Sequence, residues 1–354
     1  MNIAIDISPL KSGHYLQHRV RGTGFYIQNL RLSLEKYYSG NKYIYFNRGD
    51  SLDNNIDVVH YPYFEPFFLT LPLLSRYKTI VTVHDLTPLV FPEHFKSGLK
   101  GAVKWQIQKT SLRNAANIVT DSESSKKDIV KYTGISQSKI KVVYLAAGLD
   151  FKIVDSKLKF EGLRKKYNLP EKFVLYVGDV TWNKNLPRLI EAVKKVNVSL
   201  VMVGSALVEK DVDLSNPWNV DFAKVLGLVD GDKRILRLGF VSNEELILLY
   251  NIATVFVMPS IYEGFGLPVL EAMSCGCPVV TSKGGSLAEI AEKACKYVDP
   301  YDVDSIASGI SEVFNSTSLQ EELSKKGLIQ SKKFTWQKTA TETMGVYREI
   351  TALK

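Results

Sequence analysis

Two glutamates, Glu263 and Glu271, bracket the segment whose residue types and spacing best suit chemistry. The segment EGFGLPVLE joins them and follows the apolar run ATVFVMP, which predicts a buried strand, a glycine-containing loop and a helix that begins at Pro268. Free amides at a helix start attract phosphate, and flanking carboxylates accept hydrogen bonds from sugar hydroxyls. The segment therefore predicts a site for a phosphate or diphosphate that carries a sugar. The alternative is that Glu271 only complements the helix dipole and that Glu263 is a surface acid.

A lysine follows another apolar run, FVLYV, near the start of the second half of the chain. Gly178 comes directly after that run, and Lys184 lies in the polar loop before the helical pattern NLPRLIEAVKKV, for which Asn185 is a candidate N-cap. Lysine presents a compact positive charge that suits a phosphate. A solvated surface lysine is the alternative.

The first half of the chain offers further candidates. The segment VRGTGFYIQNL places Gly22 and Gly24 just before a helix, where a two-glycine turn approaches a ligand through its backbone; a plain turn is the alternative. The run TIVTVH ends at His84, whose imidazole is placed to exchange hydrogen bonds with a polar substrate and to be held by a neighbouring carboxylate; a structural histidine is the alternative. The segment TDSESSKKDIV fits a helix cap better than a nucleophile. Weaker cases are His14, His18, His60 and His94.

The elements that must position these residues alternate along the whole chain. Short runs rich in β-branched and aromatic residues predict strands and are separated by amphipathic helical patterns. The runs are NIAIDI, YIYF, DVVH, TIVTVH, NIVT and KVVY in the first half, and FVLYV, VSLVMVG, RILRLGF, ATVFVMP and PVVTS in the second. This alternation is typical of parallel sheets covered on both faces, and its restart after residue 172 predicts two doubly wound α/β domains. We place their boundary in the charged segment DSKLKFEGLRKKYNLPEK, so that the first domain spans residues 1–165. Ligands of such domains bind beyond the carboxyl ends of the strands, here in the cleft between the domains.

Composition limits the class of protein further. A chain of 354 residues suffices for two domains, and 45% hydrophobic with 23% charged residues is ordinary for a globular protein. Three cysteines cannot make a disulfide framework and the five histidines lack metal-ligand spacing, so we expect a reducing compartment and no metal. The start MNIAIDISPL predicts a strand rather than a signal peptide, and no apolar run approaches the roughly 18 residues of a membrane helix. We expect a cytoplasmic protein.

The net charge of +8 is distributed unevenly. Residues 1–170 carry +11 and the remaining residues carry −3. A basic first half suits an anionic membrane surface, a nucleic acid or an anionic acceptor. An ordinary solvated charged surface is the alternative.

These segments together resemble a known family. The block EGFGLPVLE is similar to the E-x7-E signature of the retaining family 4 glycosyltransferases, which have the two-domain GT-B fold. The segments RGTGFYIQNL, TVHDLTPLVFPEHF, YVGDVTWNKNL and GFVSNEELILLYNIATVFVMPS resemble other blocks of the family in kind and order, so the resemblance spans nearly the whole chain. It implies two Rossmann-like domains, of which the first binds the acceptor and the second, residues 166–335, binds the nucleotide sugar. A last helix at about 336–354 would return to the first domain.

The resemblance also implies roles for the candidate residues. Glu271 would hold the ribose hydroxyls of the donor, Glu263 would hold its sugar or assist at the reacting carbon, and His84 would touch the transferred sugar and its acceptor. The positions around the donor diphosphate would be Lys184, Gly178, Gly264, Phe265, Gly266 and Leu267, with Gly22 and Gly24 from the first domain. Many members have an arginine where this chain has Asp179. We therefore expect Lys184 to be the sole side-chain cation there, with Arg188 one turn farther along as a substitute.

The activity that the resemblance implies is retaining transfer of a hexose from a nucleotide diphosphate sugar to a glycan or lipid-linked glycan, without a metal cofactor. The pattern is most similar to members that build bacterial O-antigen and related surface polysaccharides, which implies mannose from GDP-mannose. The basic first domain would contact the inner face of an anionic membrane, and no nucleic acid is expected. Two alternatives are a sugar-nucleotide epimerase or glycan phosphorylase of the same architecture, and a non-enzymatic basic module that binds nucleic acid or membrane.

Overall fold

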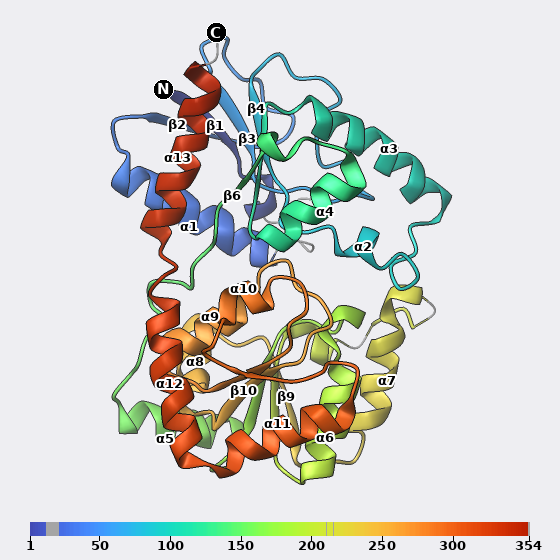
Figure 1. The fold of residues 1–354 in the computed structure, drawn as a ribbon, viewed down its shortest axis with the longest axis vertical. Coiled ribbons are helices and arrows are strands. Elements are labelled where there is room, and N and C mark those ends of the chain that lie inside the picture. The colour runs from blue at the N-terminus through green and yellow to red at the C-terminus, as the bar shows by residue number, and fades with distance from the viewer. Residues whose placement is uncertain (12–20, 210, 215, 353–354) are drawn as a thin grey trace. The chain divides into compact units, whose positions relative to one another are not determined.

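The computed structural model describes residues 1–354 except 12–20, 210, 215 and 353–354. The chain divides into two compact units (Figure 1): Met1–Ala146 with Phe334–Lys354 form the first, and Ala147–Lys333 form the second. The last helix, α13 (Trp336–Ala352), thus belongs to the first unit. His14 and His18 lie outside the described residues.

The division between the units falls earlier in the chain than residue 165. That residue lies within helix α5 (Lys157–Tyr167), which packs against α8 (Asn243–Ile252) of the second unit. Leu163 is the buried residue of α5, and Lys166 forms an ion pair with Glu245 of α8. The charge of this segment suggested a linker, but tertiary contacts make it part of the second unit.

The first unit is built on a parallel sheet of the strand order β2-β1-β3-β4-β5-β6. Its strands are β1 (Asn2–Asp6), β2 (Lys42–Phe46), β3 (Val58–Tyr61), β4 (Thr79–Thr82), β5 (Asn117–Thr120) and β6 (Ile140–Val142). Its described helices besides α13 are α1 (Arg21–Tyr37), α2 (Thr87–Val90), α3 (Gly98–Asn114) and α4 (Glu123–Thr133). Each strand includes residues of a run that the sequence predicted as a strand.

Both faces of this sheet are buried, and alternate strand residues serve different faces. Val59 and Val81 pack in one apolar cluster with Leu112 of α3 and Ile129 of α4. His60 follows Val59 on β3 and therefore points to the other face, where it is completely buried and forms a hydrogen bond with Tyr347 of α13. The helices α1 and α13 pack against each other over this second face.

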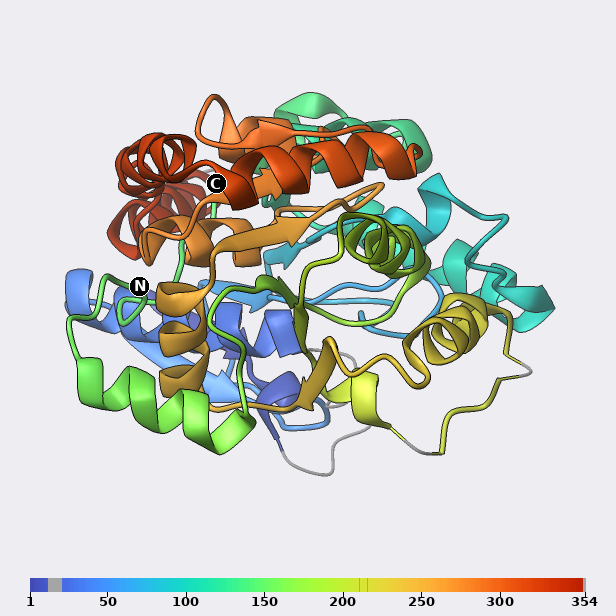
Figure 2. The same ribbon diagram turned by 90° about the horizontal axis from the view of Figure 1, so that it is seen from below.

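The second unit repeats this architecture with the strand order β12-β11-β10-β7-β8-β9, again fully parallel. Its strands are β7 (Val174–Val177), β8 (Leu200–Val203), β9 (Ile235–Gly239), β10 (Val255–Met258), β11 (Val279–Thr281) and β12 (Lys296–Tyr297). Its helices besides α5 and α8 are α6 (Leu186–Val196), α7 (Val220–Val229), α9 (Leu267–Ser274), α10 (Leu287–Ala291), α11 (Val303–Asn315) and α12 (Thr317–Ser331). Helices cover both faces of the sheet (Figure 2). Strand β12 has only two residues and was not predicted from the sequence.

Strand β10 shows how the second sheet is covered. Val255 and Val257 pack in the apolar cluster that includes Leu189 of α6. Phe256 lies between them in sequence, and its ring centroid is 5.5 Å from that of Tyr250 in α8. The strand therefore reads as continuously apolar because helices bury both of its faces.

The helix-cap interpretation of TDSESSKKDIV is confirmed. The hydroxyl oxygen of Ser122 accepts a hydrogen bond from the amide of Ser125 at 3.0 Å, so Ser122 is the N-cap of α4. Gly134 adopts a left-handed conformation at the C-cap with φ 72°. This segment therefore supplies helix termini rather than a nucleophile.

The strand order determines where loops gather in the second unit. The chain proceeds from β7 to β8 in one direction, and β10 lies on the other side of β7. In open parallel sheets, ligands bind beyond the carboxyl ends of strands at such a reversal. The loops after β7 and β10, which carry Lys184 and Glu263, leave the sheet at this point.

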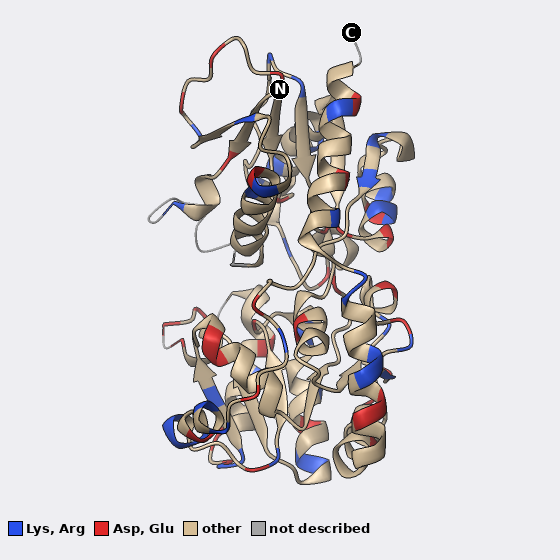
Figure 3. Cartoon of the chain, turned by 90° about the vertical axis from the view of Figure 1, so that its left-hand side faces the viewer, with Lys and Arg blue, Asp and Glu red and all other residues tan. Residues whose placement is uncertain are grey.

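Two surface properties bear on the class of protein. Among the described helices, none has both the length and the apolar character to cross a membrane. Figure 3 shows Lys and Arg interspersed with Asp and Glu on both units in that view. The excess positive charge of the first half is thus accompanied by acidic residues rather than forming one uniform face in this view.

The close approach of β7 and β8 at their carboxyl ends gives a stability prediction. A Cβ atom at Gly204 would lie 2.1 Å from the carbonyl oxygen of Gly178, so alanine there would force the two strand ends apart. We expect Gly204→Ala to lower the free energy of unfolding by about 1–3 kcal/mol, measured by urea denaturation. The control is Gly162→Ala in α5, where a Cβ meets nothing within 4 Å and alanine should stabilise the helix by up to about 1 kcal/mol. Equal stability of Gly204→Ala and the unaltered chain would contradict the expectation.

Candidate active site

An ion pair joins the loops after β7 and β10. Lys184 ends a short 3-10 turn (Trp182–Lys184), and Glu263 follows β10. The Nζ atom of Lys184 lies 2.8 Å from Oε1 and 2.7 Å from Oε2 of Glu263. The carboxylate side chain is only 9% exposed and the lysine side chain 22%, so the pair is largely screened from water. The structure thus brings together two residues that the sequence singled out separately.

Backbone hydrogen bonds hold the loop that carries Glu263. The amide of Ile261 donates to the carbonyl of Asn183 at 2.7 Å, which ties this loop to the loop of Lys184. On the other side, Ser286 donates to the carbonyl of Glu263 through its amide at 3.0 Å and to the carbonyl of Phe265 through its hydroxyl at 2.7 Å. These protein contacts fix the loop from both sides.

Helix α9 begins directly after this loop. Gly266 is its N-cap with φ 101°, a left-handed conformation that disfavours other residues, and Leu267 is its first residue. The prediction that Pro268 is the first helical residue is wrong by one position, and Glu271 is the fifth residue of the helix. Helix ends commonly differ by a residue from sequence-based placement, because the cap geometry decides them. The backbone of Gly264, Phe265 and Gly266 leads into the helix start as predicted.

Glu271 lies buried on α9 and bonds to a tyrosine side chain. The hydroxyl of Tyr250 donates to its Oε2 at 3.0 Å. Burial raises the pKa of Glu271 to about 7, and the Tyr250 hydrogen bond opposes this only in part. Both protonation states of this carboxyl are therefore accessible near neutral pH.

The other side chains of the β7 loop serve packing. Asn185 precedes α6 but makes no side-chain cap; its Nδ2 instead donates to the carbonyls of Pro259 and Pro300 at 3.0 and 2.6 Å. Asn185 thus occupies the N-cap position of α6 as predicted, but its side chain ties this loop to those of Pro259 and Pro300 instead of capping the helix. Arg188 donates to Oδ1 of Asn185 at 2.9 Å. Gly178 directly follows β7, and its amide donates to the carbonyl of Val203 at 2.9 Å.

In the first unit, an imidazole and a carboxylate meet at neighbouring strand ends. His84 follows β4 and Asp121 follows β5, and these two strands pair in parallel. The Nδ1 atom of His84 lies 2.6 Å from Oδ2 of Asp121, whose side chain is 3% exposed. The carboxylate expected beside His84 is thus Asp121.

The environment of His84 favours a proton on its ring. Burial lowers the pKa of this imidazole, but the attraction and hydrogen bond of Asp121 outweigh burial, so the pKa lies above its ordinary value. Its buried Nε2 makes no hydrogen bond of regular geometry among the described residues, although the backbone carbonyl of Pro62 lies close enough to the ring to favour its proton. An unpaired buried polar atom costs free energy, which a ligand hydroxyl at Nε2 would recover.

Gly22 and Gly24 lie in the first turn of α1, not in a turn before it. This corrects the sequence interpretation, which began the helix after the two glycines. Among the described residues, a Cβ at Gly22 would meet nothing within 4 Å and one at Gly24 would meet only Leu10. The expected contact of both glycines with a ligand stays a prediction.

Sequence reasoning missed two residues of these groups, Asp121 and Tyr250. Asp121 comes directly after the predicted strand NIVT, and the rule that site residues follow strands indicates it. Tyr250 lies within α8, and no local pattern marks it as the partner of Glu271. Within the described residues, no group of three or more His, Cys, Asp or Glu is arranged to hold a metal ion.

Comparison with known proteins identifies the family. Residues 159–329 match the model described as glycosyl transferases group 1, and residues 16–150 match that of glycosyltransferase family 4. The O-antigen chain mannosyltransferase B of Escherichia coli is 32% identical over 302 residues, which cover 82% of this chain and 75% of that protein. The chain belongs to the family 4 glycosyltransferases. It is a glycosyltransferase, and the alternative of a non-enzymatic basic module is wrong.

Other proteins agree in family and fold. The serotype-specific mannosyltransferase WbdA of Escherichia coli is 29% identical over 266 residues, which cover 75% of this chain but only 32% of that longer protein. Sucrose-phosphate synthase from Thermosynechococcus elongatus superimposes with a TM-score of 0.76 at 20% identity over 100% of both chains. HepE of Anabaena, solved with UDP and glucose, gives 0.72 at 17% identity over 98% of this chain and 99% of that one. The predicted GT-B fold, with its two doubly wound sheets, is confirmed.

The raised pKa of Glu271 predicts how stability depends on pH. Between pH 4.5 and about 7 this carboxyl is ionised in the unfolded chain but protonated in the folded chain, so its contribution to the free energy of unfolding falls as pH rises. In Glu271→Gln, which keeps an acceptor for Tyr250, that loss is removed. We expect the unaltered chain to lose about 3 kcal/mol relative to the variant across this range, measured by urea denaturation. Parallel pH profiles for both proteins would contradict the expectation.

Proposed function

We propose that this chain catalyses the retaining transfer of mannose from GDP-mannose to a glycan or lipid-linked glycan of a surface polysaccharide. The Lys184–Glu263 pair carries the proposal, because it lies beside the start of α9 where the strand order reverses. A sugar diphosphate presents an anion and several hydroxyls, which such a cation and carboxylate suit. The names of the relatives, which are mannosyltransferases, favour mannose.

Lys184 and the start of α9 would stabilise the departing diphosphate. In the transition state, negative charge grows on this leaving group while positive charge grows at the anomeric carbon. The Nζ of Lys184 and the amide of Leu267 are held in place beforehand by the loop contacts, so they need no reorganisation when the charge develops. A preorganised contact of this kind lowers the free-energy barrier by about 3 kcal/mol. Transfer is therefore expected to continue in the presence of EDTA.

Carboxylates and the imidazole would orient the donor and the acceptor. Glu271 would accept hydrogen bonds from the ribose hydroxyls through the oxygen that Tyr250 does not use. Glu263 would hold the sugar, and the Nε2 of His84 would bond to a hydroxyl of the transferred sugar or the acceptor. The bond from the anomeric carbon to the diphosphate breaks on the face where the acceptor oxygen bonds. The departing phosphate oxygen takes the acceptor proton, and the anomeric configuration is retained.

The proposal is tested with purified chain, GDP-mannose and an oligomannoside acceptor. We expect one GDP released per mannosyl group transferred, only when acceptor is present, and an α-linked product by NMR. GDP at 100 times its Kd should add about 2.7 kcal/mol to stability and raise the Tm by several degrees, more than UDP, ADP or CMP at that concentration. Lys184→Ala and Glu263→Gln should each lower kcat about 100-fold, the kinetic equivalent of about 3 kcal/mol.

The matched control is Lys195→Ala, which removes a lysine whose ion pair with Asp304 lies on the surface. It should leave kcat unchanged, because surface pairs contribute little. Unchanged kcat in both site variants would overturn the site. Protection by UDP but not by GDP would reject GDP-mannose, and a sugar epimer formed without acceptor would reject transfer.

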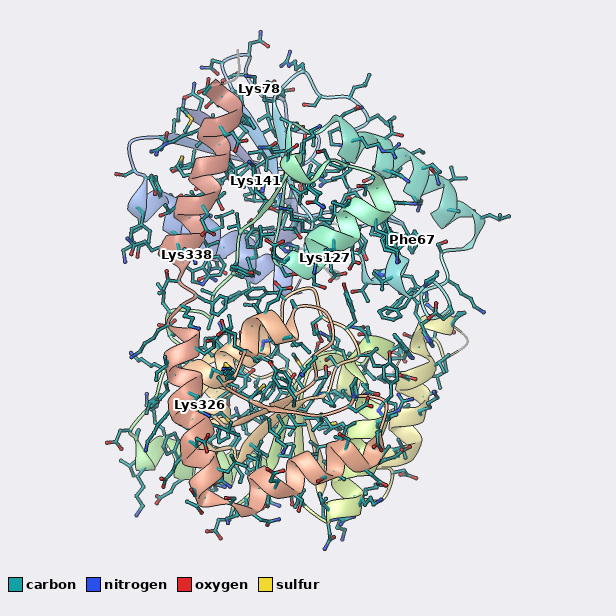
Figure 4. The ribbon with its side chains drawn as sticks, in the orientation of Figure 1. Phe67, Lys78, Lys127, Lys141, Lys326 and Lys338 are labelled. Carbon is teal, nitrogen blue, oxygen red and sulfur yellow. The ribbon has the colours of Figure 1, made fainter. Side chains whose placement is uncertain are left out.

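We further propose that α3 contacts the inner face of an anionic membrane. This helix carries Lys100, Lys104, Lys109 and Arg113 and no acidic residue. Leu99 is 90% exposed and Val103 61% exposed, one turn apart on the helix. Its inner side is anchored, since Gly101 packs against Phe67, which Figure 4 labels at this end of the unit. Exposed apolar side chains among lysines suit the boundary between lipid headgroups and acyl chains.

Co-sedimentation with phosphatidylglycerol-containing vesicles tests this contact. Each lysine near an anionic surface contributes about 1 kcal/mol, so Lys100→Gln with Lys104→Gln should weaken binding about thirtyfold. Leu99→Ser with Val103→Ser should weaken it as well, because the apolar contact is lost. The matched control is Leu158→Ser with Lys159→Gln in α5, where the leucine is 82% exposed beside lysines. Equal losses in the α3 and α5 variants would contradict a specific role for α3.

A further inference from the structure

A buried hydrogen-bond network lies next to His84 in the first unit. The Nδ1 atom of His60 in β3 lies 2.7 Å from the hydroxyl of Tyr347 in α13, and its Nε2 lies 2.8 Å from Oγ1 of Thr82 in β4. That hydroxyl lies 3.1 Å from the hydroxyl of Tyr26 in α1. All four side chains are at most 1% exposed. This hydrogen-bond network thus joins two strands and two helices, and each polar atom named here has a partner in it.

One end of the hydrogen-bond network, the ring of Tyr26, contacts the ring of His84. The ring centroid of Tyr26 is 4.9 Å from that of His84, with an interplanar angle of 86°. Thr82 also precedes His84 by two residues on the same strand end. The tyrosine ring edge and the strand end therefore depend on the same hydrogen-bonded hydroxyl. A shift of Thr82 or Tyr26 would be passed directly to the imidazole.

The two histidines divide their charge states. Burial, with a smaller contribution from the nearby His84, lowers the pKa of His60 to about 3, so His60 is neutral. His84 faces the carboxylates of Asp121 and Asp85, which raise its pKa. A neutral imidazole at position 60 adds no repulsion against a proton on His84. Replacing His60 with a permanent cation would remove that arrangement.

Contacts at both ends of α13 hold this helix, and with it Tyr347 of the hydrogen-bond network, in the first unit. The Nζ of Lys78 donates to the carbonyl of Ile350 at 2.9 Å, and Lys141 pairs with Glu349 at 2.9 Å; Figure 4 labels both lysines beside the helix. At the other end of α13, the ring of Trp336 lies 6.3 Å from that of Tyr26. The helix therefore contacts Tyr26 directly and also reaches it through His60.

We propose that Tyr347 and His60 are positioning residues of the transferase. They hold Tyr26 and the end of β4 so that the ring of His84 keeps its bond to Asp121 and presents Nε2 to the substrate. The last helix of the chain is then part of the site in the first unit, although none of its residues touches substrate. The catalytic part of this inference rests on the proposed role of His84, whereas the positioning part concerns the imidazole itself.

The main variant is Tyr347→Phe, which keeps the aromatic ring and removes the hydrogen bond to His60. A small misplacement of a reacting group reduces turnover strongly, so we expect kcat to fall about tenfold with KM for the donor unchanged. NMR titration of the His84 ring should show its pKa moving toward 6.5, because the bond to Asp121 loosens. The matched control is Tyr43→Phe. The hydroxyl of Tyr43 donates to the carbonyls of Leu34 and Tyr38 and is not part of the hydrogen-bond network.

A second pair of variants separates positioning from loss of fold. Thr82→Val removes the shared hydroxyl and should reproduce the effects of Tyr347→Phe, whereas Thr82→Ser should restore kcat and the His84 titration. If Tyr347→Phe and Thr82→Val change only Tm, by as much as Tyr43→Phe does, the positioning role is overturned. Full turnover of His84→Ala would instead reject the proposed role of His84, and the titration would still decide whether Tyr347 and His60 position its ring.

Discussion

The site in the second unit depends on the meeting of two loops at neighbouring strand ends. Strands β7 and β10 pair in parallel, so the residues that follow them leave the sheet side by side. The Lys184–Glu263 ion pair and the hydrogen bond from Ile261 to Asn183 use this proximity. The left-handed Gly266 then turns the chain into α9, which directs the amides of its first turn toward the same place. A change in strand order would separate all of these groups.

Burial sets the protonation of acidic and basic groups in both units, with different outcomes. A charge withdrawn from water is stable only when an opposite charge compensates it. His84 has Asp121 as such a partner, and its proton is favoured despite burial. Glu271 bonds to the neutral hydroxyl of Tyr250, and burial raises its pKa to about 7. His60 bonds to the hydroxyls of Tyr347 and Thr82, and burial keeps it neutral. Neighbouring side chains therefore decide which group is ionised.

Much of the fold follows from local patterns, and the errors concern boundaries. The apolar runs became strands, and the segment predicted to cap a helix supplies Ser122 as the N-cap of α4. The start of α9 was misplaced by one residue and the start of α1 by several, because a glycine is compatible with both a turn and a first helical turn. The charged segment around α5 resembled a linker, but Leu163 is buried on its inner side. Charge on one face of a helix does not reveal what its other face contacts.

By itself, the sequence determined the alternation of strands and helices, the α/β class and the polar residues that follow strands, because these depend on neighbours within a turn or a strand. It also showed two acidic residues around a helix start. Only the tertiary structure decided which residues meet. Lys184 and Glu263 are 79 positions apart, His84 and Asp121 are 37 apart, and His60 and Tyr347 are 287 apart. Such pairings depend on strand order and on the return of α13 to the first unit, which involve contacts between distant segments that no local pattern specifies.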